Sequence, residues 1–258
     1  MDLELTGKTF LITGGTDGLG LALAEQLATE GAAVGVCGRD EERLRAAERA
    51  VRAAGGDVLA QQADVSRAGD LEAFVEAAVS RWGRIDGVVH NAGRASGSSI
   101  ETIDDTTWES DFQLKLMAAV RLTRLALPQL RASHGAVLFT LAISAKAPGG
   151  ASEPSSVTRA AGMALMKALS RELAPDGIRV NAILIGLIES GQWIRMAATS
   201  GTGLQDFYDR FTANAGIPLG RFGRAGEFAD LASFLLSSRS SYLTGTAINL
   251  DGGLSPSV

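Results

Sequence analysis

Apolar segments with the period of a β-strand alternate with amphipathic helical segments along almost the whole chain. Strands are predicted over residues 8–13, 32–38, 57–62, 85–90, 136–141, 178–184 and 247–250, and helices over residues 19–30, 41–54, 70–82, 107–130, 156–173 and 225–236. Because parallel strands need a helical crossover between them, this order predicts a doubly wound parallel sheet of about seven strands with helices on both faces. We therefore expect a single Rossmann-type α/β domain over residues 1–258.

Composition and charge restrict the functions that such a domain can have. The chain has 258 residues and a net charge of -5, and an acidic surface disfavours binding to the phosphates of nucleic acids. No run of about 18 apolar residues is present, so we expect no membrane span and no membrane partner. The lone Cys37, the lack of a basic and apolar leader after Met1 and the lack of a metal-ligand cluster predict a cytoplasmic protein without a metal site.

Residues 186–223 are the one irregular stretch, rich in glycine, serine and threonine, with a single helical pattern over residues 204–211. A long insertion in an α/β domain is more often a functional cover than a defect. We therefore predict a substrate lid here, with a disordered surface loop as the alternative. Trp193, Ile194 and Met196 suggest an apolar pocket under this lid, although a collapsed core within the loop would give the same pattern.

The glycine-rich segment between the first strand and the first helix is the strongest functional signal. Residues 13–20 read Thr-Gly-Gly-Thr-Asp-Gly-Leu-Gly. Glycines let the backbone turn sharply and approach a pyrophosphate, while the following helix offers free N–H groups and the positive end of its dipole. Three glycines also fit an ordinary tight turn, but the strand–loop–helix context favours a nicotinamide dinucleotide site.

The spacing Thr-Gly-x-x-x-Gly-x-Gly resembles that of the short-chain dehydrogenase/reductase family, and further motifs extend the resemblance over nearly the whole chain. These are Asp64-Val65, Asn91-Ala92-Gly93, residues 177–181, Gly186 with Ser190, and Asp251-Gly252-Gly253. The resemblance implies a small-molecule substrate and a set of cofactor contacts. That set is Gly14, Thr16, Asp17, Gly18, Leu19, Gly20, Arg39, Asp64, Val65, Asn91, Ala92, Gly93, Arg159, Gly186 and Ile188.

The end of the second strand bears on which dinucleotide binds. An acidic residue there would bind the adenosine ribose of NAD(H), whereas an arginine just beyond it can pair with the 2′-phosphate of NADP(H). Arg39 stands where NADP-binding members of the family carry theirs, although a solvated arginine at a helix start is the alternative. Asp17 opposes this interpretation, because a carboxylate near phosphates is unfavourable. We favour NADP(H) over NAD(H).

The resemblance implies a catalytic group of serine, tyrosine, lysine and asparagine, and the chain departs from it at every position. Ser155 stands at the tyrosine position and Arg159 at the lysine position. The serine position falls at Ile143, with Ser144 one step away, and Lys115 stands where asparagine is expected. A serine hydroxyl is a much weaker acid than a phenol, so the usual proton donor is missing. Arg159 could still hold ribose hydroxyls.

Two residues could replace the lost acid. Lys115, if buried near the cofactor, could have a lowered pKa and donate a proton, and the alternative is a lysine paired with an acid or a backbone carbonyl. Tyr208 could swing from the lid over the nicotinamide, and the alternative is an apolar contact beside its aromatic neighbours.

Other polar residues near the expected site are weaker candidates. Glu153, Lys146 and Ser144 lie in or near the loop after the fifth strand and are expected to be solvated. His134 precedes the fifth strand, at the wrong end of the sheet for catalysis, and His90 lacks a partner in sequence.

Three functions remain open. The first is a redox enzyme that interconverts a carbonyl and an alcohol with NADP(H) through a substituted proton donor. The second is a catalytically inactive cofactor-binding protein that acts as a regulatory or structural partner. The third is non-redox chemistry on the same scaffold. The resemblance also implies a homotetramer or homodimer, in which the long helix and the Ser155 helix form the interface.

Overall fold

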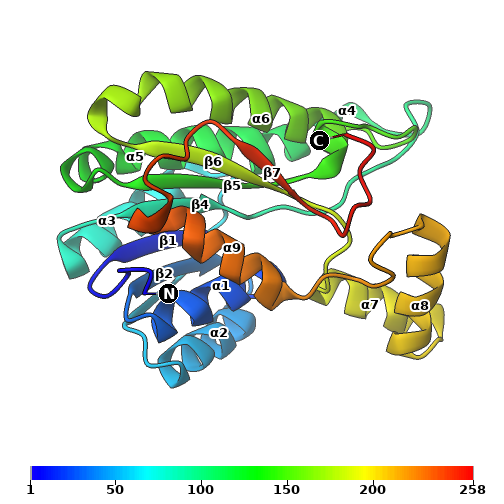
Figure 1. The fold of residues 1–258 in the computed structure, drawn as a ribbon, viewed down its shortest axis with the longest axis horizontal. Coiled ribbons are helices and arrows are strands. Elements are labelled where there is room, and N and C mark those ends of the chain that lie inside the picture. The colour runs from blue at the N-terminus through cyan, green and yellow to red at the C-terminus, as the bar shows by residue number, and fades with distance from the viewer. Residues whose placement is uncertain (1, 258) are drawn as a thin grey trace.

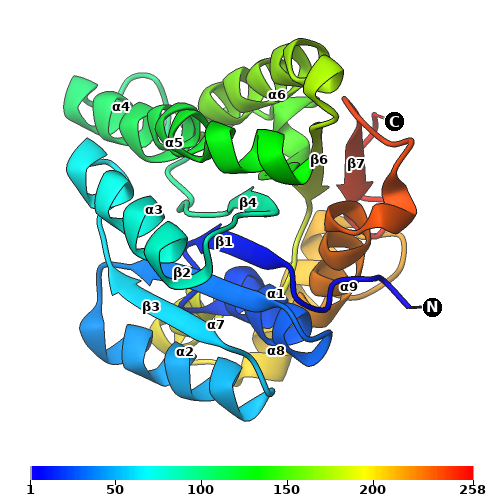
Figure 2. The same cartoon turned by 90° about the vertical axis from the view of Figure 1, so that its left-hand side faces the viewer.

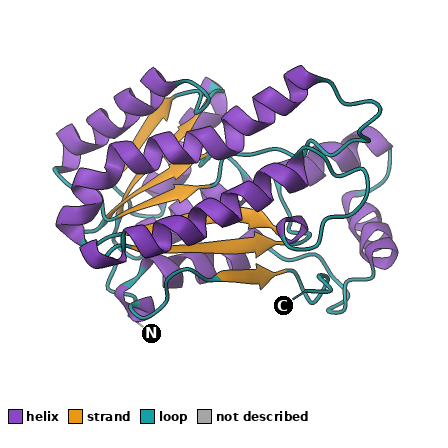
Figure 3. Cartoon of the chain, turned by 90° about the horizontal axis from the view of Figure 1, so that it is seen from above, coloured by secondary structure: helices purple, strands orange, loops and turns teal. Residues whose placement is uncertain are grey.

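A seven-stranded parallel sheet forms the centre of the computed structural model, which describes residues 2–257. Its strand order is β3-β2-β1-β4-β5-β6-β7, and the arrows in Figure 3 point toward the same side of the molecule. The strands are β1 (Thr9–Thr13), β2 (Ala33–Gly38), β3 (Val58–Gln62), β4 (Gly87–His90), β5 (Ala136–Ala142), β6 (Arg179–Ile185) and β7 (Ala247–Leu250). The predicted doubly wound α/β fold is therefore confirmed.

Helices cover both faces of this sheet (Figure 2). They are α1 (Gly18–Thr29), α2 (Glu41–Ala53), α3 (Ala68–Trp82), α4 (Asp105–Phe112), α5 (Ala118–Ser133), α6 (Ser155–Glu172), α7 (Gly191–Ser200), α8 (Leu204–Ala215) and α9 (Ala225–Leu236). Phe74 of α3, Leu122 of α5 and Met166 of α6 pack in one buried cluster, and Leu23 of α1 and Phe228 of α9 pack in the other. Each face of the sheet thus has its own core.

The direction of strand order reverses between β1 and β4, which pair with each other although three helices separate them in sequence. Leu11 of β1 lies between Gly35 of β2 and Val88 of β4. At such a reversal the crossover connections leave on opposite faces, so a crevice opens beyond the carboxyl ends of the two strands. The loops that follow β1 and β4 meet there.

The predicted helix over residues 107–130 is interrupted. The chain forms α4, then a π-helical turn over Gln113–Met117, and then α5. A π-turn widens the helix by one residue and changes the direction in which its side chains point, and such turns are frequent at functional sites. Hydrophobic spacing alone did not reveal this, because apolar residues continue on both sides of the turn.

The 186–223 segment contains two helices, α7 and α8, where the sequence predicted one. They project beyond the carboxyl ends of the strands and stand apart from the main body (Figure 1). Phe207, Tyr208 and Phe222 are buried in an apolar cluster of their own, with Trp193 packed against it. Within residues 2–257 no helix is both long and apolar enough to cross a membrane.

Candidate functional site

A cavity of about 710 Å³ opens at the carboxyl ends of β1 and β4. It extends from the glycine loop to Ser155, and the 186–223 segment forms part of its wall. All but one of the predicted cofactor contacts line it, namely Gly14, Thr16, Asp17, Gly18, Leu19, Arg39, Asp64, Val65, Asn91, Ala92, Gly93, Arg159, Gly186 and Ile188. The fold thus assembles these residues, which come from the five loop regions after β1, β2, β3, β4 and β6 and from helix α6, around one space.

Gly20 is the exception, since it lies beneath the glycine loop and does not line the cavity. A Cβ atom at this position would lie 2.4 Å from the carbonyl oxygen of Gly14 and 2.5 Å from Nδ2 of Asn91. Asn91 donates from that nitrogen to the carbonyl oxygens of Thr13 and Gly14, both at 3.1 Å. The Asn91 amide therefore holds the loop in shape, and Gly20 lets α1 approach it closely.

The N-terminus of α1 is free to bind an anion. Asp17, at the N-cap position, makes no side-chain bond to the first turn, unlike Asp40 of α2, whose carboxylate accepts from the N–H of Arg43 at 2.9 Å. The exposed N–H groups and the helix dipole therefore face the cavity without a competing cap. Together with the glycine backbone, this geometry fits the pyrophosphate of a dinucleotide.

Asp17 pairs instead with two arginines. Its Oδ2 lies 3.1 Å from Nη1 of Arg195 in α7 and 4.0 Å from Nη1 of Arg43. These contacts balance the carboxylate charge that argued against NADP(H), and they connect the glycine loop to the 186–223 segment.

Two arginines line the cavity near the end of β2, Arg39 and Arg43. Sequence analysis identified only the first. The second stands in the first turn of α2, four residues later, and its nearness to Arg39 in sequence was a signal that a second cation faces the same space. Both are exposed side chains on the cavity wall, so either can reach a phosphate bound there.

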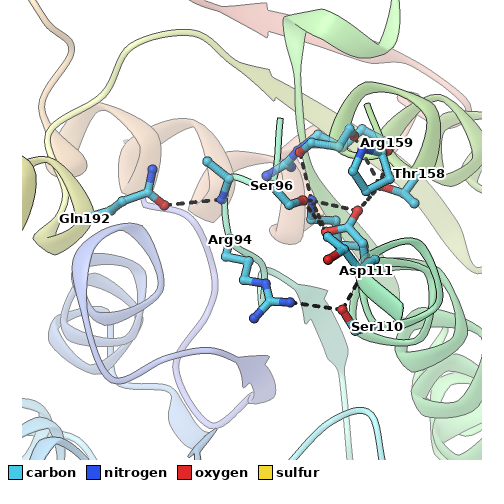
Figure 4. A network of polar contacts seen from close by, with 12 residues as sticks. Arg94, Ser96, Ser110, Asp111, Thr158, Arg159 and Gln192 are labelled. Carbon is cyan, nitrogen blue, oxygen red and sulfur yellow. Dashed lines mark hydrogen bonds and ion pairs between the residues drawn. The ribbon is translucent and has the colours of Figure 1, made fainter. Parts of the chain in front are cut away.

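The opposite end of the cavity contains a buried polar network around Lys115, shown in Figure 4. Lys115, in the π-turn, has Nζ 2.7 Å from Oδ1 of Asp111 and donates to Oγ of Ser155 at 2.8 Å and to Oγ of Ser96 at 3.1 Å. Thr158 donates to Oδ2 of Asp111 at 2.6 Å, and Ser96 donates to the same carboxylate. The lysine therefore pairs with an acid and also touches the residue at the expected tyrosine position.

The surroundings of this network shift the pKa values of Asp111 and Lys115. Burial by itself would raise the pKa of Asp111, but hydrogen bonds from Lys115, Ser96 and Thr158 hold it below its ordinary value. Burial of the ammonium and the positive charge of Arg159 lower the pKa of Lys115 to about 8, despite the opposing effect of Asp111. A lysine with this pKa exchanges protons near neutral pH.

Ser155, at the start of α6, and Ser144 both line the large cavity. Arg159 lies one helical turn after Ser155, and its Nη1 donates to the carbonyl oxygen of Thr140 at 3.2 Å. The Arg159 Nη2 atom lies 3.7 Å from the place of a Cβ on Gly93. Lys115 itself lines a smaller space of about 20 Å³ directly behind, so Ser155 stands between it and the large cavity.

Tyr208 and Lys146, two weaker candidates from the sequence, make contacts away from the large cavity. Tyr208 is buried in the aromatic cluster, 4.6 Å from the ring of Phe222, so the apolar interpretation is confirmed. Lys146 is not solvated as expected, because its Nζ donates to the carbonyl oxygen of Ala247 at 3.0 Å.

The two histidines and Glu153 also lie away from the large cavity. Burial lowers the pKa of His90 to about 3, and its ring packs on Phe139. His134 is exposed and donates to the carbonyl oxygen of Asp176 at the opposite end of the sheet. Glu153 was expected to be solvated, but its Oε2 is buried without a hydrogen-bond partner within residues 2–257.

Of the three apolar residues proposed for the pocket, only Trp193 lines the cavity. Ile194 and Met196 are exposed on the outer side of α7, so that part of the prediction is wrong. The helix turns those two side chains away, whereas Trp193 packs on Phe222 with ring centroids 5.5 Å apart. Gln192 and Arg195 also line the cavity, and no sequence pattern identified them.

Comparisons with known proteins agree with this geometry. The family model described as enoyl-(acyl carrier protein) reductase matches residues 14–255. The 3-oxoacyl-[acyl-carrier-protein] reductase FabG of Staphylococcus aureus is 30% identical over 250 residues, covering 96% of this chain and 98% of the relative.

Two solved structures are similar over nearly their whole length. An NADPH-bound short-chain oxidoreductase of Pseudomonas aeruginosa PAO1, described as containing an atypical catalytic center, has a TM-score of 0.92 and 38% identity, covering 97% of this chain and 98% of that one. L-sorbose reductase of Gluconobacter frateurii, in complex with NADPH and L-sorbose, has a TM-score of 0.94 and 36% identity and covers 100% of both chains.

Proposed function

Because the chain belongs to the short-chain dehydrogenase/reductase family of NAD(P)-dependent oxidoreductases, we propose that it interconverts a carbonyl and an alcohol with NADP(H), using Lys115 as the proton donor. One observation carries this proposal, which is the hydrogen bond of 2.8 Å from Lys115 Nζ to Ser155 Oγ. It connects a lysine with a pKa of about 8 to a hydroxyl that faces the large cavity. Lys115, Ser155 and Arg159 then function at the asparagine, tyrosine and lysine positions of the family, together with Ser144, which lies one step after the serine position.

When bound, the nicotinamide supplies or accepts the hydride at the carbonyl carbon. The chain's own residues transfer the proton. Ser155 Oγ donates its proton to the developing alkoxide oxygen and receives one from Lys115 Nζ, so Lys115 ends the step as a neutral amine. Solvent then protonates Lys115 again, and alcohol oxidation follows the same path in reverse.

The relay accounts for how serine can stand at the tyrosine position. A serine hydroxyl alone is too weak an acid near neutral pH, but a hydroxyl that passes on a proton from an ammonium never has to become an alkoxide. Asp111, which is fully buried, fixes the lysine with its carboxylate and keeps the ammonium form accessible. Ser144, on the same cavity wall, would bind the substrate oxygen.

The cofactor contacts proposed here follow the cavity. The N–H groups of α1 and the glycine backbone would hold the pyrophosphate, Arg39 and Arg43 the 2′-phosphate of NADP(H), and Arg159 the nicotinamide ribose. We also propose that the 186–223 segment is the lid, since Gln192, Trp193 and Arg195 of α7 belong to the cavity wall. Closure would exclude water during hydride and proton transfer, and reopening would let solvent protonate Lys115 again.

The test is turnover by the purified chain with NADPH and a panel of ketones, followed by oxidation of the product alcohols with NADP⁺. Lys115→Met should lower kcat by about 10²- to 10⁴-fold, the usual contribution of general acid catalysis. NADPH binding, followed by fluorescence, should change little. Lys167→Met is the matched control, because Lys167 is an exposed α6 lysine whose Nζ donates to the Gly245 carbonyl at 3.0 Å.

Two outcomes would contradict the proposal. If the wild-type chain binds NADPH but turns over no substrate in a broad panel, the inactive cofactor-binding function is favoured. If turnover occurs and Lys115→Met retains it, the proton comes from elsewhere.

We propose that the protein forms a homodimer or homotetramer through α4 and α6. These helices contact each other, and each exposes a large apolar side chain, Phe112 and Val157 respectively. Size-exclusion chromatography with light scattering tests this. A monomer at micromolar concentration, or an oligomer that is unaffected by Phe112→Asp with Val157→Asp, would contradict it.

A further inference from the structure

The Ser155 end of the cavity has more positive than negative charges. Three cations lie there, since Arg159 and Arg94 line the cavity wall and Lys115 stands directly behind Ser155. The positive charges of Arg159 and Arg94 both act on Lys115 and help to lower its pKa. Both arginines are therefore close enough to Lys115 for their charges to act on it.

One carboxylate faces these cations, and the network already uses it. Asp111 is fully buried and accepts hydrogen bonds from Lys115, Thr158 and Ser96. Its charge balances one cation. Within residues 2–257, neither Arg94 nor Arg159 has an ion pair with any acid at 4.0 Å or less.

The remaining acids of the cavity wall lie at its other end. They are Asp17 in the glycine loop, Asp40 after β2 and Asp64 after β3. Asp17 pairs with Arg195 and Arg43, and Asp40 caps α2. Glu153, which precedes α6, is not on the cavity wall. The positive charge beside Ser155 is therefore not balanced by neighbouring side chains.

Arg94 is held where it can meet a ligand. It follows Gly93 directly, its side chain is exposed on the cavity wall, and its Nη2 donates to Oγ of Ser110 at 3.0 Å. The next residue, Ala95, donates its N–H to Oε1 of Gln192 in α7 at 3.3 Å. Figure 4 shows Arg94 between the Asp111 network and Gln192 of α7, and within residues 2–257 its guanidinium makes no hydrogen bond besides the one to Ser110.

We infer that the substrate carries a carboxylate, which Arg94 binds while the substrate carbonyl faces Ser155. This inference rests on the proposed function and names the substrate class, a small oxo-carboxylate or the matching hydroxy-carboxylate. A carboxylate can accept two parallel hydrogen bonds from a guanidinium, which fixes its direction as well as its distance. It also supplies the negative charge that the protein does not provide at this end of the cavity.

The experiment compares 2-, 4- and 5-oxohexanoate with their methyl esters, which have nearly the same shape and no charge. The wild-type enzyme with NADPH should prefer at least one acid over its ester in kcat/KM. Arg94→Gln should lower that preference by about 10- to 100-fold, mostly through KM, as expected for loss of a charged hydrogen-bond partner. Arg49→Gln, a change on the outer side of α2, is the matched control and should leave the preference unchanged.

The outcomes separate this inference from the proposed function. If the esters are reduced as well as the acids, or if Arg94→Gln leaves the preference unchanged, the carboxylate inference is wrong while the reductase stands. If neither these compounds nor the broad ketone panel is reduced, the proposed function fails. In that case calorimetric binding of hexanoate and of hexanamide to the NADPH-loaded protein tests the inference directly, and equal binding of the two would overturn it.

Discussion

The two ends of the cavity are built in different ways. The glycine-loop end is made by the backbone of consecutive residues, with Gly20 and Asn91 supporting the loop from below. The Lys115 end is made by side chains from segments far apart in sequence, since Ser96, Asp111 and Thr158 come from three different parts of the chain. A backbone site depends on local spacing, whereas a side-chain network depends on every element that positions it. The comparison shows that the glycine-loop end can be recognised from local spacing, whereas the Lys115 end depends on the packing of the whole domain.

The largest effect on folding is expected from the buried charge at the Lys115 end. Asp111→Asn leaves the Lys115 ammonium buried without its partner, which should cost about 3–5 kcal/mol in free energy of unfolding. Asp176→Asn is the control, because it breaks an exposed ion pair with Arg131 and should cost less than about 1 kcal/mol. Urea denaturation measures both. Equal losses would mean that Asp111 is not the structural anchor of this network.

The glycine-loop end should be disrupted by a single methyl group. Gly20→Ala places a Cβ against the Gly14 carbonyl and the Asn91 amide, so we expect a loss of about 1–3 kcal/mol in stability and weaker NADPH binding by at least about tenfold. Gly69→Ala is the matched control, because nothing lies within 4 Å of a Cβ there. Fluorescence titration and thermal unfolding measure the two effects. If Gly20→Ala binds NADPH as the wild type does, the close approach of α1 is not needed for the site.

The preference for NADPH over NADH should depend on the positive charges at the glycine-loop end of the cavity. Arg39→Ala should reduce the preference for NADPH over NADH by about 10- to 100-fold, the usual range for a hydrogen bond to a charged group. Arg43→Ala should have a similar or smaller effect, because Arg43 also faces Asp17. Dissociation constants for both cofactors, measured with each variant, test this. An unchanged ratio in the double variant would assign the 2′-hydroxyl or 2′-phosphate to other residues.

The pH dependence of turnover should report on the Lys115 end. Lys115 must be protonated to reduce a carbonyl, so the reductive kcat should be constant at low pH and fall as the pH rises through about 8. At pH 9 the expected loss is about tenfold, and alcohol oxidation should show the opposite trend. A reductive profile that stays flat from pH 7 to pH 9.5 would contradict a role for this lysine.

The fold could be predicted almost entirely from sequence, because strand and helix periods are local properties and the parallel order follows from their alternation. The structure differs from the prediction at two elements that local sequence patterns did not indicate. Apolar residues continue through the π-turn over Gln113–Met117, and no helix was predicted over the Gly191–Ser200 segment that forms α7. Arg94, Gln192 and Arg195 became visible as site residues only once the cavity wall was known, whereas the nearness of Arg43 to Arg39 in sequence was a signal that went unused.

By itself the sequence determined the sheet, its flanking helices and the glycine loop, since each of these depends on residues close together in the chain. It also identified Lys115, Ser155 and Arg159 as residues of unusual type at the expected catalytic positions. For Lys115 it left two interpretations, a proton donor or a lysine paired with an acid or a backbone carbonyl. The tertiary structure placed that lysine against both Asp111 and Ser155. There, burial and the charge of Arg159 lower its pKa to about 8. Only the packed structure could do this, because the pKa of a lysine depends on its burial and on charges that reach it from distant parts of the chain.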